Sequence, residues 1–140
     1  MTFEAQMRVG SLEIAAALLA VAVIAARPRV RAAAEIGRLL PMRVALDVLE
    51  FGRPRPFEGR PPFEVGRDGV LDLVLSDPEV SRRHARFESR NGVVYVDDLK
   101  SRNGSFLNGR RINEAIEVRD GDAIDVGTTR MVVRAVEPWT

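Results

Sequence analysis

The chain has 140 residues, a length that suits one small domain with an additional segment. Its 21 lysines and arginines nearly balance its 20 aspartates and glutamates, and it contains one tryptophan and one tyrosine. A general nucleic-acid binder normally has a strong basic excess and stacking aromatic residues, so nucleic acid is not expected as a partner. Cysteine is absent, which excludes disulfides and thiolate metal sites.

An apolar segment, residues 9–26, dominates the beginning of the chain. It contains a single charge, Glu13, and is followed directly by Arg27-Pro28-Arg29. As a helix rising 1.5 Å per residue it would be about 27 Å long, close to the thickness of a bilayer core. Three interpretations are open: a membrane span, a signal peptide cleaved near Ala20-Val21-Ala22, or a soluble helix packed against protein. We interpret residues 1–26 as a hydrophobic helix that anchors the chain in the membrane.

Basic residues are unevenly distributed around this segment. Arg8 precedes it alone, whereas four arginines follow it between positions 27 and 38. The positive-inside rule therefore predicts that the rest of the chain lies in the cytoplasm. A soluble cytoplasmic protein is the alternative. Residues 27–41 are interpreted as a basic linker or short helix, which either rests on anionic headgroups or serves as a solvated spacer.

Residues 42–137 predict an all-β domain, followed by a short tail at residues 138–140. Strand-like apolar runs recur at 44–49, 63–65, 72–75, 85–88, 93–96, 116–118, 123–126 and 131–136. Asn91-Gly92 is a strong hairpin signal, and Gly52-Arg53-Pro54-Arg55-Pro56 is interpreted as a turn that interrupts the strands. Many short strands without intervening helices predict a sandwich of two antiparallel sheets.

Polar residues suited to an anion occur in the turns between these runs. Gly66-Arg67 follows an apolar strand, and Ser81-Arg82-Arg83-His84 follows a turn-rich connection. Arginine offers a planar fork of charged donors, and the serine hydroxyl adds a small one. The Asn103 amide can both donate and accept, which suits an extended peptide backbone. Turns that meet at one end of a sandwich would form a local anion site from these groups.

His84 is the only histidine, and we expect neither a metal site nor a general base there. Metal binding needs several ligands, and the chain has no second histidine and no cysteine. It also lacks a glycine-rich phosphate loop and a nucleophile elbow, so no cofactor and no enzymatic activity are expected. The acidic residues of Asp97-Asp98 and Asp120-Gly121-Asp122 are interpreted as solvated turn residues.

Three motifs, in this order, resemble those of the forkhead-associated (FHA) domain, a module that reads phosphothreonine. They are Gly66-Arg67, Ser81-x-x-His84 and Asp98-Leu99-x-Ser101-x-Asn103-Gly104-Ser105-Phe106-Leu107-Asn108-Gly109, within a resemblance that covers roughly residues 42–136. The resemblance implies an FHA-type sandwich in which the phosphopeptide is bound by Arg67, Ser81, Arg82, Arg102 and Asn103. It also implies that the site is supported by Gly66, His84, Gly104 and Asn108.

Within this set, the resemblance assigns the phosphate to Arg67 and Ser81 and the peptide backbone to Asn103. It implies that His84 fastens the binding loop through hydrogen bonds. Arg102 stands where threonine is common in the family, and Asn108-Gly109 is a tight turn without a ligand role.

The function implied is that of a phosphopeptide-binding adaptor in Ser/Thr-kinase signalling at the cytoplasmic face of the membrane. Its partner would be a threonine-phosphorylated protein, either a Ser/Thr kinase or a kinase substrate, because the chain resembles small bacterial FHA proteins that work with such kinases. The alternative is a scaffold subunit, in which the FHA fold assembles a membrane complex independently of phosphate.

Overall fold

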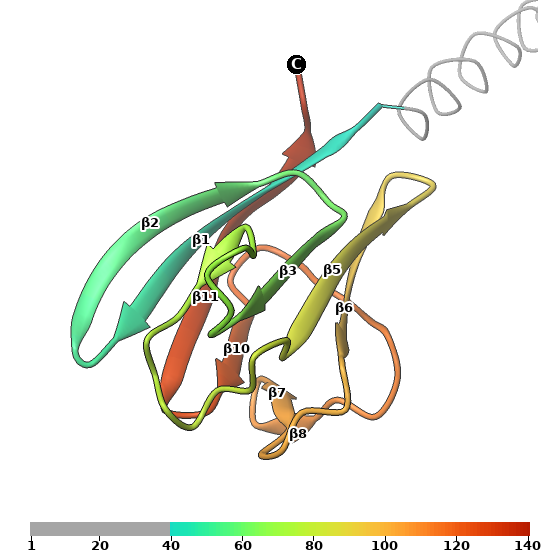
Figure 1. The fold of residues 1–140 in the computed structure, drawn as a ribbon. Helices are drawn as coiled ribbons and strands as arrows, with labels where there is room; N and C mark the ends of the chain where they lie inside the picture. Colours follow the sequence, from blue (N-terminus) through green and yellow to red (C-terminus); the bar gives the residue numbers. More distant parts are fainter. Residues whose placement is uncertain (1–39) are drawn as a thin grey trace, which may run out of the picture. The chain divides into compact units, whose positions relative to one another are not determined.

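The computed structural model describes residues 40–140, drawn in colour in Figure 1. The apolar segment 9–26 and nearly all of the linker 27–41 lie outside the described residues. Residues 40–140 hold no helix that is long and apolar enough to cross a membrane. Their regular structure consists of strands: β1 Met42–Glu50, β2 Arg53–Gly59, β3 Phe63–Gly66, β4 Leu73–Val74, β5 Ala85–Arg90, β6 Val93–Asp98, β7 Ser105–Leu107, β8 Arg110–Arg111, β9 Ile116–Glu117, β10 Ala123–Val126 and β11 Thr129–Pro138.

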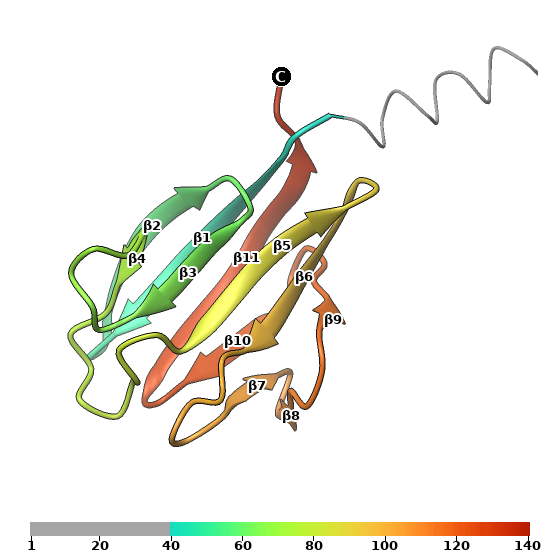
Figure 2. The ribbon, with the colours of Figure 1, turned by 45° about the vertical axis from the view of Figure 1, so that its right-hand side comes forward.

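The strands form two sheets that pack face to face (Figures 1 and 2). One sheet has the order β2-β1-β11-β10-β7-β8, and the other has the order β4-β3-β5-β6-β9. Neighbouring strands are antiparallel, except that β3 and β4 pair in parallel over two residues. The predicted all-β sandwich is therefore confirmed, with one short parallel pair that the sequence did not indicate.

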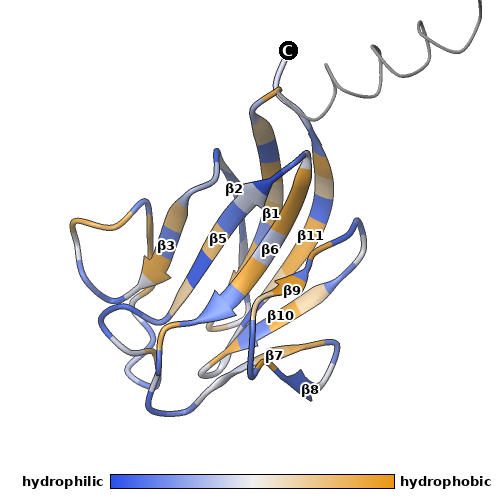
Figure 3. Ribbon diagram, turned by 90° about the vertical axis from the view of Figure 1, so that its right-hand side faces the viewer, coloured by the Kyte–Doolittle hydropathy of each residue, from blue (hydrophilic) through white to orange (hydrophobic). Residues whose placement is uncertain are grey.

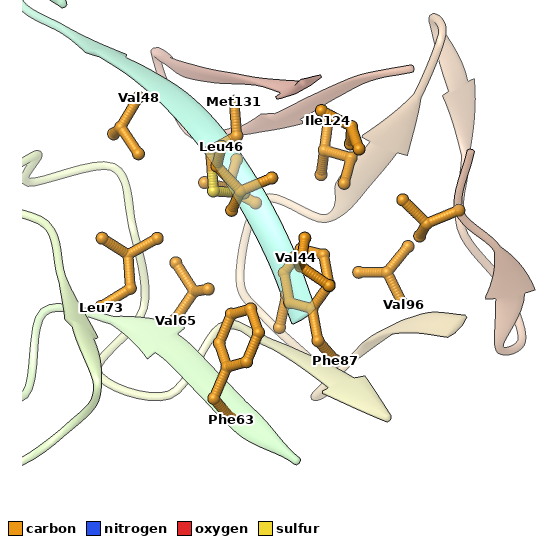
Figure 4. Close-up of a cluster of buried hydrophobic side chains, with 14 of the residues drawn as sticks. Val44, Leu46, Val48, Phe63, Val65, Leu73, Phe87, Val96, Ile124 and Met131 are labelled. Carbon is orange, nitrogen blue, oxygen red and sulfur yellow. The ribbon is translucent and has the colours of Figure 1, made fainter. Parts of the chain in front are cut away.

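A core of aliphatic and aromatic side chains fills the space between the sheets (Figure 4). In β1, Val44, Leu46 and Val48 are fully buried, whereas the alternate positions Arg43 and Asp47 are only partly covered. This period of two is the pattern expected of a strand with one face on the core, and it shows as alternating colours in Figure 3. Phe63 and Phe87 face β1 from the other sheet with stacked rings, whose centroids lie 4.6 Å apart.

The interpretation of residues 52–56 as a turn is wrong, because most of them belong to strand β2. Pro54 pairs with Leu49 and Pro56 with Asp47 in an antiparallel ladder. Proline lacks an N–H group and is tolerated in a sheet where that position faces solvent. The strand order puts β2 at the edge of its sheet, so both prolines fit there and also discourage a further strand from adding.

Two Asn-Gly pairs form tight turns between antiparallel strands. Asn91 and Gly92 have φ values of 52° and 75° and connect β5 to β6, which confirms the predicted hairpin. Asn108 and Gly109 have φ values of 49° and 82° and connect β7 to β8, which confirms the predicted turn. Two successive residues with positive φ match the twist of hairpin strands, and asparagine and glycine adopt this conformation most readily.

Candidate functional site

The predicted binding residues come from connections that lie at the lower end of the sandwich in Figure 1. They follow β3, β4 and β6, whereas β1 enters and β11 leaves the sandwich at the opposite end. The β3–β4 and β4–β5 connections are joined by backbone hydrogen bonds. The Arg67 N–H donates to the Ser81 carbonyl and the Asp68 N–H to the Arg82 carbonyl, each over 3.1 Å.

Gly66 allows these two connections to approach. A Cβ atom at this position would lie 2.1 Å from the Arg82 carbonyl oxygen and 2.9 Å from that of Ser81. Only a residue without a side chain fits so close to another backbone. Gly66 therefore brings Arg67 beside Ser81, although the two residues are far apart in the sequence.

Arg67 is an exposed side chain that is fixed at one point. Its Nε donates to the Val80 carbonyl oxygen, and the two terminal nitrogens of the guanidinium have no partner within residues 40–140. The backbone contact orients the guanidinium plane and leaves the outer edge of the fork available. Such a fork matches the spacing of two phosphate oxygens.

Ser81 presents a hydroxyl group beside this guanidinium. Its Oγ accepts a hydrogen bond from the Arg102 backbone N–H over 3.0 Å. This contact occupies a lone pair and leaves the hydroxyl proton available for donation. The same bond ties the β4–β5 connection to the β6–β7 connection.

His84 is fully buried and links the β4–β5 connection to the β6–β7 connection. Its Nδ1 accepts from the Ser81 N–H over 3.0 Å, so the ring proton lies on Nε2, which donates to the Gly104 carbonyl over 2.9 Å. The histidine therefore fixes the backbone on which Ser81 is carried. Its support of a phosphopeptide site stays a prediction.

Asp98 organises the β6–β7 connection, although it was interpreted as solvated. Its carboxylate accepts hydrogen bonds from the Ser101 N–H and hydroxyl and from the Ser105 hydroxyl, over 2.6–2.9 Å. Burial by itself would raise the pKa of Asp98, but the hydrogen bonds from Ser101 and Ser105 outweigh it and the pKa lies below its usual value. The carboxylate is thus ionised and sets the shape of the loop that carries Asn103.

Asp77 has a supporting role that sequence reasoning missed. The side chain is fully buried, and its Oδ2 accepts from the Thr128 N–H and from the hydroxyls of Thr128 and Thr129 over 2.7–2.9 Å. Its Oδ1 accepts from the Glu79 N–H over 2.9 Å. Burial opposes ionisation, but these hydrogen bonds prevail and lower the pKa of Asp77. The β10–β11 turn is thereby attached to the β4–β5 connection.

Asn103 has partners within the chain. Its Nδ2 donates to the Glu79 backbone carbonyl over 2.8 Å and to the Glu79 carboxylate over 3.0 Å. The Oδ1 of the same amide accepts no hydrogen bond within residues 40–140. A peptide backbone could therefore donate to Oδ1 directly, whereas it would have to compete with Glu79 for the Nδ2 group.

These residues surround a hollow of about 190 Å³, which we call the loop hollow. It is lined by Arg67, Pro78, Glu79, Val80, Ser81, Arg102 and Asn103. Four of the five predicted binding residues therefore converge on it. Arg82 is exposed but does not line it, and Asn108 lies apart, at the β7–β8 turn, where its amide pairs with Asp122 and Ala123.

Comparison with known proteins places the chain in a family. Residues 63–127 match the FHA domain family. FhaB, an FHA domain-containing protein of Mycolicibacterium smegmatis, is 37% identical over 76 residues, which cover 54% of this chain and 49% of FhaB. The FHA domain of the CT664 protein from Chlamydia trachomatis is 32% identical with a TM-score of 0.62, over 66% of this chain and 97% of that domain.

A third neighbour was determined with a ligand. The FHA domain of yeast Dun1, in complex with a doubly phosphorylated peptide, is 28% identical with a TM-score of 0.55, over 68% of this chain and 74% of that one. The chain belongs to the FHA domain family. It spans about half the length of the curated relatives it matches.

Proposed function

We propose that residues 42–137 form a phosphopeptide-binding domain that reads phosphothreonine, and that the protein acts as an adaptor rather than an enzyme. The observation that carries this function is the loop hollow, where the open edge of the Arg67 guanidinium lies with the free hydroxyl proton of Ser81. Both groups are donors, and both are held by backbone contacts before a ligand arrives. Arg102 and Asn103 line the same hollow and would contact the peptide beside the phosphate.

The two donors can account for a strong dependence on phosphate. Charge-assisted hydrogen bonds contribute about 1.5–3 kcal/mol each, and about 1.4 kcal/mol corresponds to a tenfold change in affinity. The preference for threonine over serine would come from burial of one methyl group, worth about 0.8 kcal/mol or roughly fourfold. Phosphate dependence should therefore be the larger effect.

The test is a titration of the full chain with matched phosphorylated and unphosphorylated threonine peptides from a degenerate library. We expect binding to the phosphorylated set alone, and a loss of at least tenfold for Arg67→Ala. Arg119→Ala is the matched control, because Arg119 pairs with Glu117 and, with Met42 and Gly92, lines a different hollow at the opposite end of the sandwich. Equal affinity for both peptide sets would overturn the proposal.

The cellular role is the broader part of this proposal. The partner would be a threonine-phosphorylated protein, a Ser/Thr kinase or a kinase substrate, met at the cytoplasmic face of a membrane that residues 9–26 would cross. The support is the apolar composition of that segment and the arginines that follow it. Pull-down from native membranes with and without phosphatase tests location and phosphate dependence together. Retention of partners after phosphatase treatment and in Arg67→Ala would favour a phosphate-independent scaffold.

A further inference from the structure

Eight arginines within residues 40–140 are paired with carboxylates. Arg43 contacts Glu58 and Glu137, Arg83 contacts Glu64, and Arg130 contacts Asp125. The other five are Arg55, Arg86, Arg90, Arg119 and Arg134. Such pairs neutralise these charges locally and leave little attraction for an external anion.

A second group of cations is exposed and unpaired. It consists of Arg82 in the β4–β5 connection, Lys100 and Arg102 in the β6–β7 connection, and Arg110 and Arg111 in β8. None of these side chains makes an ion pair or hydrogen bond within residues 40–140. We call them the cationic rim. Arg53, the first residue of β2, also makes no ion pair or hydrogen bond through its side chain within residues 40–140 and is not part of the rim.

The rim begins at the loop hollow and continues away from it. Arg102 lines the hollow. The guanidinium of Arg111 packs over Gly104, next to Asn103, since a Cβ atom on Gly104 would lie 3.2 Å from the Arg111 Nε. Beyond it, Arg110 and Arg111 line a second hollow of about 370 Å³. Figure 2 shows β7 and β8 at the same end of the sandwich as the loops.

Few acidic groups oppose this charge. Glu79 lies in the loop hollow against the Asn103 amide, and Glu114 is the one carboxylate in the lining of the second hollow. A phosphate bound between Arg67 and Ser81 would neutralise charge on the β3–β4 side. The guanidiniums of β8 would remain without an ion-pair partner among residues 40–140.

From this distribution we infer that the cationic rim binds acidic side chains that flank the phosphothreonine of the partner. The favoured ligand is a phosphothreonine with a cluster of aspartates or glutamates within a few residues. This specificity depends on the phosphothreonine site proposed for Arg67 and Ser81. Exposed ion pairs contribute about 0.2–1 kcal/mol each, so several together give roughly a five- to tenfold preference at low ionic strength. Added salt should weaken it, because the charges are exposed.

The test compares short phosphothreonine peptides that differ only in flanking charge. One set has a glutamate cluster on the amino side or the carboxyl side, a second has glutamine at these positions, and a third has lysine. We expect the full chain to bind one of the glutamate peptides about five- to tenfold more tightly than its glutamine counterpart. The variant Arg110→Glu with Arg111→Glu should reverse this order and prefer lysine, a gain that misfolding cannot produce.

Arg90→Glu with Arg119→Glu is the matched control. It makes the same change in net charge near the β5–β6 hairpin, at the opposite end of the sandwich. This control should keep the wild-type preference for glutamate. Phosphate-dependent binding with no effect of flanking charge, or with an unchanged order in the reversed variant, would overturn the rim specificity and leave the phosphothreonine site standing. Equal binding of phosphorylated and unphosphorylated peptides would overturn both.

Discussion

At the scale of single residues, Gly66 controls how closely the β3–β4 and β4–β5 connections approach. A methyl group there would overlap the Arg82 carbonyl oxygen, which belongs to the backbone and cannot swing aside. We expect Gly66→Ala to lower the free energy of unfolding by about 1–3 kcal/mol and to weaken phosphopeptide binding, because Arg67 and Ser81 would separate. Urea denaturation and peptide titration measure the two effects. Gly69→Ala is the control, since its Cβ would meet open space. Equal behaviour of both variants would contradict the steric role.

Glu79 is a carboxylate in the lining of a hollow proposed for a dianion. Its charge repels the phosphate, and its contact with the Asn103 amide competes with a peptide backbone. We expect Glu79→Gln to strengthen phosphopeptide binding by about two- to fivefold at low salt, because glutamine keeps an acceptor for Asn103 and removes the charge. The gain should shrink as salt is added. A variant that binds no better than wild type at low ionic strength would show that the Glu79 charge does not act on the ligand.

At the scale of elements, hydrophobic periodicity predicted most strands, and the Asn-Gly pairs predicted one hairpin and one tight turn. They failed at β2, because its prolines are acceptable only on an edge strand, and position within a sheet is a tertiary property. Within the site, the residue types of Arg67 and Ser81 suggested an anion site without coordinates. The supporting role of Asp77 could not be predicted from the sequence, because its partners Thr128 and Thr129 are about fifty positions away. A local sequence pattern does not indicate a contact between residues so far apart.

His84 links two elements of the site, and its removal should affect both. Replacement by leucine would leave the Ser81 N–H and the Gly104 carbonyl unpaired in a buried place, at a cost of about 1–3 kcal/mol for each group. We expect His84→Leu to lower stability, and amide hydrogen exchange at Ser81 to become faster. His84→Gln has both a donor and an acceptor and should retain part of the protection. Exchange at Ser81 that remains as slow as in wild type would contradict this bridging role.

At the scale of the whole molecule, the hydrophobic core and the proposed binding site lie in different parts of the sandwich. The core is continuous between the sheets, whereas the loops at one end are held mainly by buried or half-buried polar groups: His84, Asp77 and Asp98. Each joins segments that are distant along the chain. The loops can therefore keep a defined shape without apolar side chains that would fill the hollow. Their stability should in turn depend on the ionisation of the two aspartates.

Acid should accordingly destabilise the whole domain through Asp77 and Asp98. Because hydrogen bonds lower both pKa values in the folded protein, the unfolded chain, in which aspartate titrates near pH 3.9, binds protons more readily. The stabilisation is thus fully present above about pH 5, where aspartate is ionised in both states, and is lost as the pH falls through the folded-state pKa values. Arg83 also lowers the pKa of Glu64, which adds to the same slope. Urea unfolding from pH 7 down to about pH 2 should show this decline, and Asp77→Asn with Asp98→Asn should be less stable at neutral pH with a flatter profile. A double variant with the wild-type pH dependence would show that other groups control acid unfolding.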